Sequence, residues 1–211
     1  MKKIKAVIFD MDGVLIDAVD WHYEALNKSL SLFGYTISES EHKYRFDGLP
    51  TSVKLKKLSL EKDLPEKLHG FINEMKQAYT IEYIFKYCRP RFTHEYALTK
   101  LKRDGYKIGL ASNSIRKTIE IMMEKANLIN LFDVILSNQD VDKAKPDPEI
   151  YIKAINLMEL QPEECLILED NENGLKAAYD SGAHVLKVDS VCDVNYLNIA
   201  NKLTQIERLQ S

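Results

Sequence analysis

The fold is decided by residues 4–14, which read IKAVIFDMDGV. The run Ile4–Phe9 has the length of a strand, is rich in Val and Ile, and is apolar almost throughout. Continuous rather than alternating hydrophobicity favours a strand that is covered on both faces, as in a parallel sheet. Asp10 and Asp12 follow where this run ends, and Gly13 permits a sharp departure from the strand. The stretch therefore predicts an inner strand with two carboxylates at its carboxyl end.

Four more short apolar runs resemble the first, and each follows a segment with helical periodicity. The runs are Lys107–Ala111, Val134–Leu136, Leu166–Leu168 and His184–Val188. The helical segments before them are Thr93–Arg103, Ile115–Ala126, Glu149–Met158 and Asn173–Ser181. Repeated helix and strand units of this kind predict an α/β fold with a doubly wound, Rossmann-like parallel sheet.

Residues 17–88 interrupt this alternation, because they show helical periodicity and no convincing strand. Ser38 and Glu41 have the form of a capping box, and Pro65 opens a long amphipathic stretch. We predict a small all-helical domain of residues 17–88, inserted after the first strand into a core of residues 1–16 and 89–211. The tail after Asp189 is too weakly patterned to predict its structure.

The composition excludes several classes of protein. The chain has 211 residues, 45% of them hydrophobic and 29% charged, which is ordinary for a globular protein. A net charge of -3 and a pI near 6.0 give no attraction to nucleic acid or acidic membranes, so we expect neither as a partner. Three scattered cysteines fit a reducing compartment better than a disulfide framework. No apolar stretch is long enough for a signal peptide or a membrane span, so we expect a cytoplasmic protein.

Polar residues that follow the apolar runs are candidate site residues, because ligands of open α/β sheets bind outside the carboxyl ends of the strands. They are Asp10, Asp12, Ser112, Asn113, Lys145, Glu169 and Asp170. Each motif also has an ordinary interpretation. Asp-x-Asp-Gly occurs in turns and calcium loops, and Ser114 after Ser112 could simply cap the next helix. A lone lysine such as Lys145 is usually a surface residue. Acidic groups gathered at one edge would repel one another without a cation, and a few hard oxygen ligands suit Mg²⁺.

Four short motifs, taken in their order along the chain, resemble the signature motifs of the haloacid dehalogenase (HAD) superfamily. These stations are Asp10-x-Asp12-Gly13, Ser112, Lys145-Pro146, and Glu169-Asp170 with Gly174. The position of the helical insertion resembles that of the C1 cap of the same superfamily. The resemblance covers essentially the whole chain and is strongest with the β-phosphoglucomutase and phosphoglycolate-phosphatase-like branch. It implies a HAD core with a C1 cap and an enzyme that transfers a phosphoryl group.

The resemblance also implies a role for each station. Asp10 is expected to attack phosphorus and carry an aspartyl-phosphate. Asp12 is expected to protonate the leaving group and then activate water. Ser112 would hydrogen-bond the transferring phosphoryl oxygens, and Lys145 would neutralise the charge that builds on them. The implied Mg²⁺ ligands are Asp10, the backbone carbonyl of Asp12, Asp170 and, directly or through water, Glu169. Dehalogenases of the superfamily lack the second aspartate, so Asp12 excludes that activity.

Substrate-binding candidates come from the cap and its edge. They are His22, Gly48, Thr51 and Asn113. His22 also has the ordinary interpretation of a helix histidine that is half-packed against the core or exposed. Mutases of the branch carry an arginine at the position of Thr51, where it holds the distal phosphate. Arg45 or Lys54 could compensate for the missing arginine, and the sequence does not choose between them. The departure favours a hydrolase over a mutase.

Three functions follow in order of preference. The first is a Mg²⁺-dependent phosphatase (EC 3.1.3.-) whose partner is a small-molecule phosphate ester, such as a sugar phosphate. The second is a phosphomutase like β-phosphoglucomutase. The third is a catalytically silent binding protein that keeps the fold. We expect a monomer, because the cap already covers the site.

Overall fold

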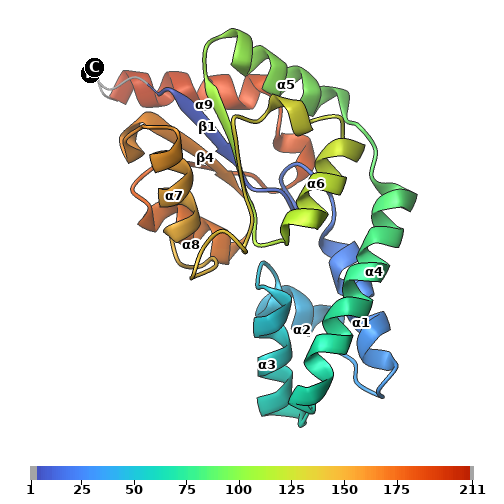
Figure 1. Cartoon of the computed structure of the whole chain (residues 1–211). Helices are drawn as coiled ribbons and strands as arrows, with labels where there is room; N and C mark the ends of the chain where they lie inside the picture. Colours follow the sequence, from blue (N-terminus) through green and yellow to red (C-terminus); the bar gives the residue numbers. More distant parts are fainter. Residues whose placement is uncertain (1–3, 210–211) are drawn as a thin grey trace.

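The computed structural model describes residues 4–209, and its centre is a sheet of five parallel strands (Figure 1). The strands are β1 (Ala6–Phe9), β2 (Lys107–Ala111), β3 (Val134–Leu136), β4 (Cys165–Glu169) and β5 (His184–Lys187). Their order across the sheet is β3-β2-β1-β4-β5. The first strand lies in the middle because the chain winds outward from it in both directions. The predicted doubly wound α/β fold is confirmed.

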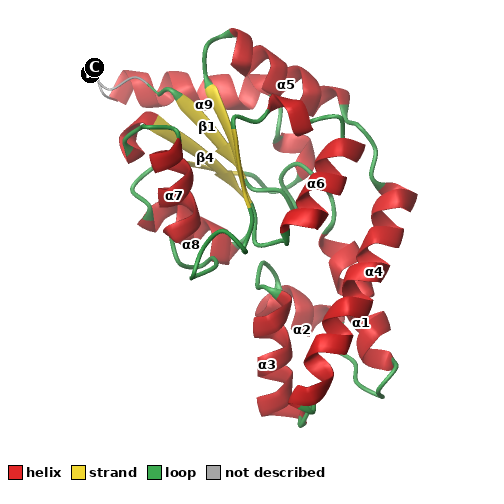
Figure 2. Ribbon diagram, viewed as in Figure 1, coloured by secondary structure: helices red, strands yellow, loops and turns green. Residues whose placement is uncertain are grey.

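Helices cover both faces of the sheet (Figure 2). Those on one face are α5 (Phe92–Arg103), α6 (Arg116–Lys125) and α9 (Tyr196–Leu209). Those on the other are α7 (Glu149–Leu157) and α8 (Glu172–Asp180). Short turns of helix connect the layers at η3 (Ile129–Leu131), η4 (Pro162–Glu164) and η5 (Val191–Asp193). No described helix has both the length and the apolar character needed to cross a bilayer.

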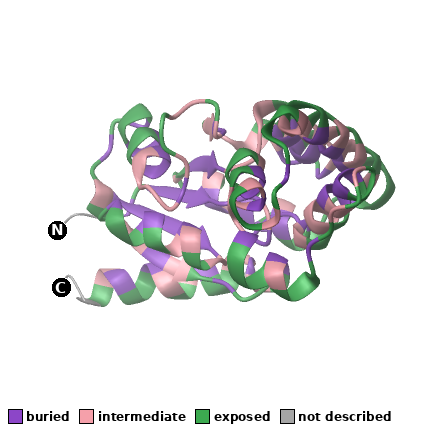
Figure 3. Cartoon of the chain, turned by 90° about the horizontal axis from the view of Figure 1, so that it is seen from below, coloured by how far each residue is buried: buried purple, intermediate pink, exposed green. Residues whose placement is uncertain are grey.

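The side chains of β1 explain its unbroken apolar run. Val7 and Phe9 pack into the hydrophobic cluster under α5, α6 and α9, whereas Ala6 and Ile8 pack into the cluster under α7 and α8. All four are fully buried, and Figure 3 shows the strands buried between the outer layers. Successive strand residues point to opposite faces, so a strand between two layers must be apolar at every position.

A second body, built from helices, follows β1 in the chain (Figure 1). Its helices are α1 (Val19–Ser31), α2 (Glu39–Glu41), η1 (His42–Phe46), α3 (Thr51–Lys62), η2 (Glu66–Leu68) and α4 (His69–Tyr87). It has its own hydrophobic cluster, in which Leu26, Phe46, Leu55 and Ile72 are buried. The predicted capping box is present, with the Ser38 side chain accepting from the backbone N–H of Glu41 at 3.1 Å.

Some expected boundaries differ from the structure. The first strand begins at Ala6 rather than Ile4, and the tail that the sequence left open forms α9, which packs on the sheet through Ile199, Leu203 and Ile206. The outer bounds of the predicted core domain, residues 1 and 211, lie outside the described residues. The division into residues 1–16 with 89–211 and residues 17–88 stays a prediction.

Candidate active site

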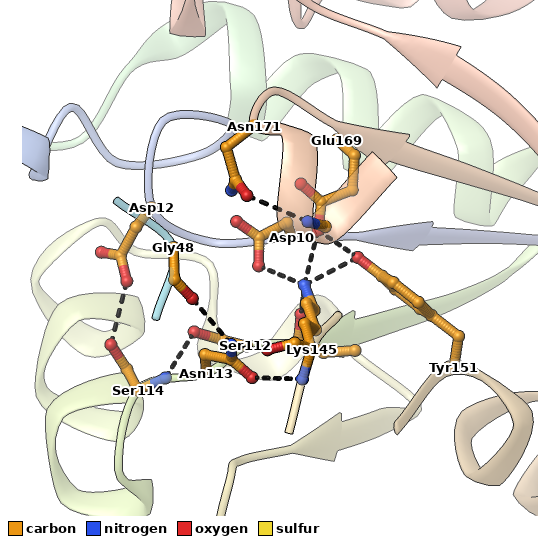
Figure 4. Close-up of polar contacts among 12 residues, drawn as sticks. Asp10, Asp12, Gly48, Ser112, Asn113, Ser114, Lys145, Tyr151, Glu169 and Asn171 are labelled. Carbon is orange, nitrogen blue, oxygen red and sulfur yellow. Dashed lines mark hydrogen bonds and ion pairs between the residues drawn. The ribbon is translucent and has the colours of Figure 1, made fainter. Parts of the chain in front are cut away.

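Three neighbouring strands deliver their next residues to one edge of the sheet. Phe9 of β1 pairs with Leu110 of β2 on one side and with Leu168 of β4 on the other. The residues that follow, Asp10 and Glu169 among them, therefore emerge side by side (Figure 4). Ser112 comes one position later from β2 and is buried, with its N–H donating to Leu136 at 3.1 Å. The sheet order thus unites motifs that lie far apart in the sequence.

Lys145 reaches this edge from the loop between β3 and α7 and is the centre of the polar network (Figure 4). Its Nζ lies 2.7 Å from Asp10 Oδ1, 2.6 Å from Glu169 Oε1 and 2.9 Å from the carbonyl oxygen of Ala111. The side chain is 3% exposed, so these contacts replace its water. Burial alone would lower the pKa of Lys145, but the charges of Asp10 and Glu169 raise it, and the ammonium stays charged.

Tyr151 is a member of this network that the sequence did not reveal. Its hydroxyl accepts from Lys145 at 2.7 Å and donates to Glu169 Oε1 at 2.5 Å. The side chain is fully buried on α7. By helical spacing Tyr151 belongs to the apolar face of α7 that packs on the sheet. Only the folded structure shows that its hydroxyl forms hydrogen bonds in the site.

Asp10 is held in an environment that disfavours its charge. Burial raises the pKa of Asp10 well above its usual value, and the carboxylate of Glu169 adds to this rise. Lys145 acts in the opposite direction and offsets part of the effect. Burial and Glu169 likewise raise the pKa of Asp170 to about 7. One lysine therefore balances three crowded carboxyl groups incompletely.

These three carboxyl groups form a donor set that fits a hard divalent cation. One oxygen each of Asp10, Glu169 and Asp170 lies within 4.8 Å of the others, and all ligand atoms are oxygen. Gly13 makes room for the cluster, because it has a φ of +85° and a Cβ there would lie 1.9 Å from Asp170 Oδ2. A cation such as Mg²⁺ would neutralise the negative charge of these carboxyl groups that Lys145 does not balance.

The side chain of Asp12 faces the helical body rather than the carboxylate cluster of Asp10, Glu169 and Asp170. Its Oδ2 accepts from Ser114 Oγ at 2.9 Å, and its Oδ1 lies 3.0 Å from His22 Nε2. Burial alone would raise the pKa of Asp12, but its interactions with His22 and the hydrogen bond of Ser114 together lower it. The carboxylate form is therefore favoured in this arrangement.

Ser114 does not act as the helix cap that its position suggested. The helix α6 begins after Ile115, which has no side-chain cap, and the Ser114 hydroxyl instead holds Asp12. Ser112 Oγ accepts from the Ser114 N–H at 3.0 Å, so the two serines position each other.

The side chain of His22 lies between the two bodies and is 12% exposed, which excludes an exposed helix histidine. Its Nδ1 lies 3.2 Å from Nζ of Lys76, a lysine on α4. When Lys76 is an ammonium it can only donate, so Nδ1 then accepts and the Nε2–H donates to Asp12. Burial lowers the pKa of His22, and the charge of Lys76 lowers it further, which favours this neutral tautomer.

The loop between η1 and α3, in the helical body, contacts the core. Figure 1 shows this loop projecting toward the sheet. Asn113 Nδ2 donates to the carbonyl of Gly48 at 2.7 Å, and Asn173 Nδ2 donates to the carbonyl of Asp47 at 2.9 Å. Gly48 has a φ of +69°, and a Cβ there would lie 2.5 Å from Asn171 Oδ1. Only glycine allows so close an approach, so the loop lies directly against the core at this point.

A cavity of about 330 Å³ lies between the two bodies and unites most of the expected residues. The predicted residues that line it are Asp10, Asp12, His22, Gly48, Thr51, Ser112, Asn113 and Lys145. Glu169 and Asp170 adjoin Asp10 in the carboxylate cluster and do not line the cavity. The amide of Asn113 is engaged by Gly48 and by both backbone groups of Lys145.

Comparison with known proteins gives a consistent result. Residues 7–188 match the family described as haloacid dehalogenase-like hydrolase. A phosphorylated carbohydrates phosphatase of Thermotoga maritima is 29% identical over 182 residues, which is 85% of this chain and 82% of the relative. A pyrophosphatase PpaX of Bacillus mycoides is 28% identical over 201 residues, 88% of this chain and 84% of the relative. The crystal structure of β-phosphoglucomutase from Clostridium difficile shares the fold, with a TM-score of 0.83, 23% identity and coverage of 97% of this chain and 99% of that one.

Proposed function

Because the chain belongs to the haloacid dehalogenase-like hydrolase family, we propose that it is a Mg²⁺-dependent phosphatase that acts through a phosphorylated Asp10. The family resemblance drawn from the four motif stations is confirmed, and so is the class of phosphoester hydrolase. The observation that carries the proposal is the buried contact of Asp10 with Lys145, beside Asp12 on the wall of one cavity.

In the first step, one carboxylate oxygen of Asp10 attacks phosphorus while the bond from phosphorus to the ester oxygen breaks. Lys145 holds Oδ1 at 2.7 Å, which fixes the orientation of the nucleophile. Ser112 lies on the cavity wall where its hydroxyl donates to the transferring oxygens. Asp12 gives its proton to the departing alkoxide. The enzyme is left with a phosphorylated Asp10 and an ionised Asp12.

In the second step, Asp12 takes a proton from water, and the resulting hydroxide attacks phosphorus as the bond to Asp10 breaks. The lowered pKa of Asp12 keeps its carboxyl group ionised and able to accept a proton, because burial is outweighed by the influence of His22 and Ser114. For the first step Asp12 must hold a proton, and the negative charge of an incoming phosphate favours its uptake. Inorganic phosphate is released and Asp10 is regenerated.

We propose that Asp10, the backbone carbonyl of Asp12 and Asp170 hold Mg²⁺. Both oxygens of Glu169 already accept hydrogen bonds, from Lys145, Tyr151 and the N–H of Asp170, so Glu169 would act through its charge or a bridging water. When bound, Mg²⁺ supplies positive charge between the nucleophilic carboxylate and the phosphate, so that two anions can meet.

We propose that residues 17–88 are a cap that admits substrate by moving away from the core. The contacts of Gly48 and Asp47 with the core are hydrogen bonds of single side chains, which can open and re-form. The substrate class that the first relative suggests is a phosphorylated carbohydrate. The cytoplasmic location and the monomeric state of the protein stay predictions.

The experiment that tests the function is a phosphate-release screen with Mg²⁺ over sugar phosphates, other metabolite monoesters and pyrophosphate. A phosphatase releases phosphate from at least one of them, and EDTA abolishes the release. Interconversion of β-glucose 1-phosphate and glucose 6-phosphate without release would instead favour the mutase. Thr51, which offers no cationic grip for a second phosphate, argues for the phosphatase. Absence of release and of interconversion for every ester would favour the silent binding protein.

Asp12→Ala is expected to separate esters by their leaving groups. Loss of a positioned acid costs about 10²–10⁴-fold on an alkyl phosphate such as a sugar phosphate. The loss in the first step, measured as the burst of nitrophenol, should be much smaller on para-nitrophenyl phosphate, because nitrophenolate departs without a proton, whereas the second step loses its base with either ester. The backbone carbonyl at this position is kept, so the Mg²⁺ concentration for half-maximal activity should not change. Equal losses in the first step on both esters would contradict an acid role for Asp12.

A further inference from the structure

The hydroxyl of Tyr151 lies between the two charged groups that meet beside Asp10. It accepts from Lys145 Nζ at 2.7 Å and donates to Glu169 Oε1 at 2.5 Å (Figure 4). The side chain is fully buried on α7 and does not line the cavity. A buried tyrosine hydroxyl needs only one partner, and a backbone carbonyl would serve. Contact with both members of an ion pair points to a role in arranging that pair.

The ammonium of Lys145 has more acceptors around it than hydrogens to give. Its three N–H groups face four oxygen atoms, namely Asp10 Oδ1 at 2.7 Å, the carbonyl oxygen of Ala111 at 2.9 Å, Tyr151 Oη at 2.7 Å and Glu169 Oε1 at 2.6 Å. Because the last two oxygens lie 2.5 Å apart, the angle between them at Nζ is much smaller than the tetrahedral angle between two N–H bonds. One hydrogen is therefore shared between Tyr151 and Glu169, and the other two serve Asp10 and Ala111.

Glu169 competes with Asp10 for this ammonium. Its side chain is 0% exposed, so its charge has to be satisfied by the protein. The carboxylate is also held in place, because its Oε2 accepts from the N–H of Asp170 at 3.1 Å and a Cβ on Gly174 would lie 2.0 Å from its Oε1. Without the hydroxyl of Tyr151, the shared hydrogen would go to Glu169 alone. The tighter ion pair would then draw Nζ away from Asp10.

We propose that Tyr151 is a positioning residue for phosphoryl transfer. Its hydroxyl satisfies Glu169, so that the ammonium of Lys145 is free to hold Asp10 and the charge that builds on the transferring group. A hydroxyl suits this task because it is neutral, and it supplies a hydrogen bond to Glu169 without adding a second positive charge. This inference rests on the proposed phosphatase function of the same site.

The test is Tyr151→Phe, which removes the hydroxyl and keeps the ring, whose centroid lies 4.5 Å from Lys145 Nζ. Release of nitrophenol from para-nitrophenyl phosphate, with enzyme in excess over the ester, reports the first step alone. We expect its maximal rate to fall about tenfold, because the cation is displaced from the reacting centre. The enzyme concentration for half of that rate should not change, since Tyr151 does not line the cavity. The matched control is Tyr179→Phe, at a residue of α8 that is 62% exposed, and it should behave as the wild type.

The same substitution in a Glu169→Gln background shows whether the hydroxyl acts through Glu169. A neutral amide no longer competes for the ammonium, so Tyr151→Phe should there slow the first step by no more than about twofold. Loss of packing alone would slow it by the same factor in both backgrounds. Equal factors in the two backgrounds, or an unchanged rate in Tyr151→Phe alone, would overturn the proposal.

A crystal structure of Tyr151→Phe gives a readout that does not need turnover. Nζ of Lys145 should lie farther from Asp10 Oδ1 than the 2.7 Å of the wild type, while its contact with Glu169 is kept. An unchanged position of the lysine would contradict the proposal. If the wild type hydrolyses esters and Tyr151→Phe is equally fast, the inference fails and the phosphatase stands. If the wild type hydrolyses none, the phosphatase fails, and the position of Lys145 in the variant decides the inference.

Discussion

Asp10→Asn is expected to lower Mg²⁺-dependent phosphate release by a factor on the order of 10³ or more, because an amide oxygen is a poor nucleophile toward phosphorus. The fold should survive. Asp10 is 4% exposed, and the amide oxygen of asparagine can still accept from Lys145. Burial and the neighbouring carboxylate of Glu169 raise the pKa of Asp10, so removing this charge relieves repulsion. Stability in EDTA should therefore stay the same or rise.

The measurements are phosphate release, thermal unfolding and a search for an acyl phosphate on the protein, which survives acid and is released by hydroxylamine. Asp17→Asn serves as a control, because its side chain is 72% exposed and removes the same charge near the start of the chain. The wild type and the control should both yield a phosphorylated protein when quenched in acid, and Asp10→Asn should not. Substantial hydrolysis by Asp10→Asn would disprove the proposed mechanism.

Much of this site is predictable from sequence because its residues are tied to strand ends. A strand such as Lys107–Ala111, which is apolar and bounded by polar residues, was placed to the residue. The residue after such a strand is brought to the binding edge whatever the rest of the chain does. Asp10, Ser112 and Glu169 could therefore be named without knowing any contact between them.

The residues that were missed lie inside helices or act through tertiary contacts. Tyr151 lies on the apolar face of α7, and Lys76 lies within α4 as one more charged residue of an amphipathic helix. Their roles depend on which group stands opposite them, and the sequence contains no signal of this. The helix α9 was a different kind of omission. Ile199, Leu203 and Ile206 follow the spacing of one helical face, so the pattern was present in a segment of otherwise polar residues.

The second large effect is expected for Lys145→Met, which should impair both activity and stability. The lysine is 3% exposed and is the ion-pair partner of Asp10 and Glu169. Removing one partner of a buried ion pair costs about 3–5 kcal/mol, because the other charge is left uncompensated. Loss of the same cation from the reacting centre should lower kcat by about 10²–10³-fold. Urea unfolding in EDTA and phosphate release with Mg²⁺ measure the two effects.

The two roles of Lys145 can be separated by the cation. Without the lysine, Asp10, Glu169 and Asp170 present more uncompensated negative charge to a divalent cation, so Mg²⁺ should restore part of the lost stability and do so more strongly than in the wild type. It should not restore activity, because the orientation of Asp10 by the lysine is still lost. Lys143→Met, in the same loop but 73% exposed at its side chain, should change neither. An inactive Lys145→Met protein with wild-type stability in EDTA would show that the lysine acts on the substrate alone and does not hold the carboxylates together.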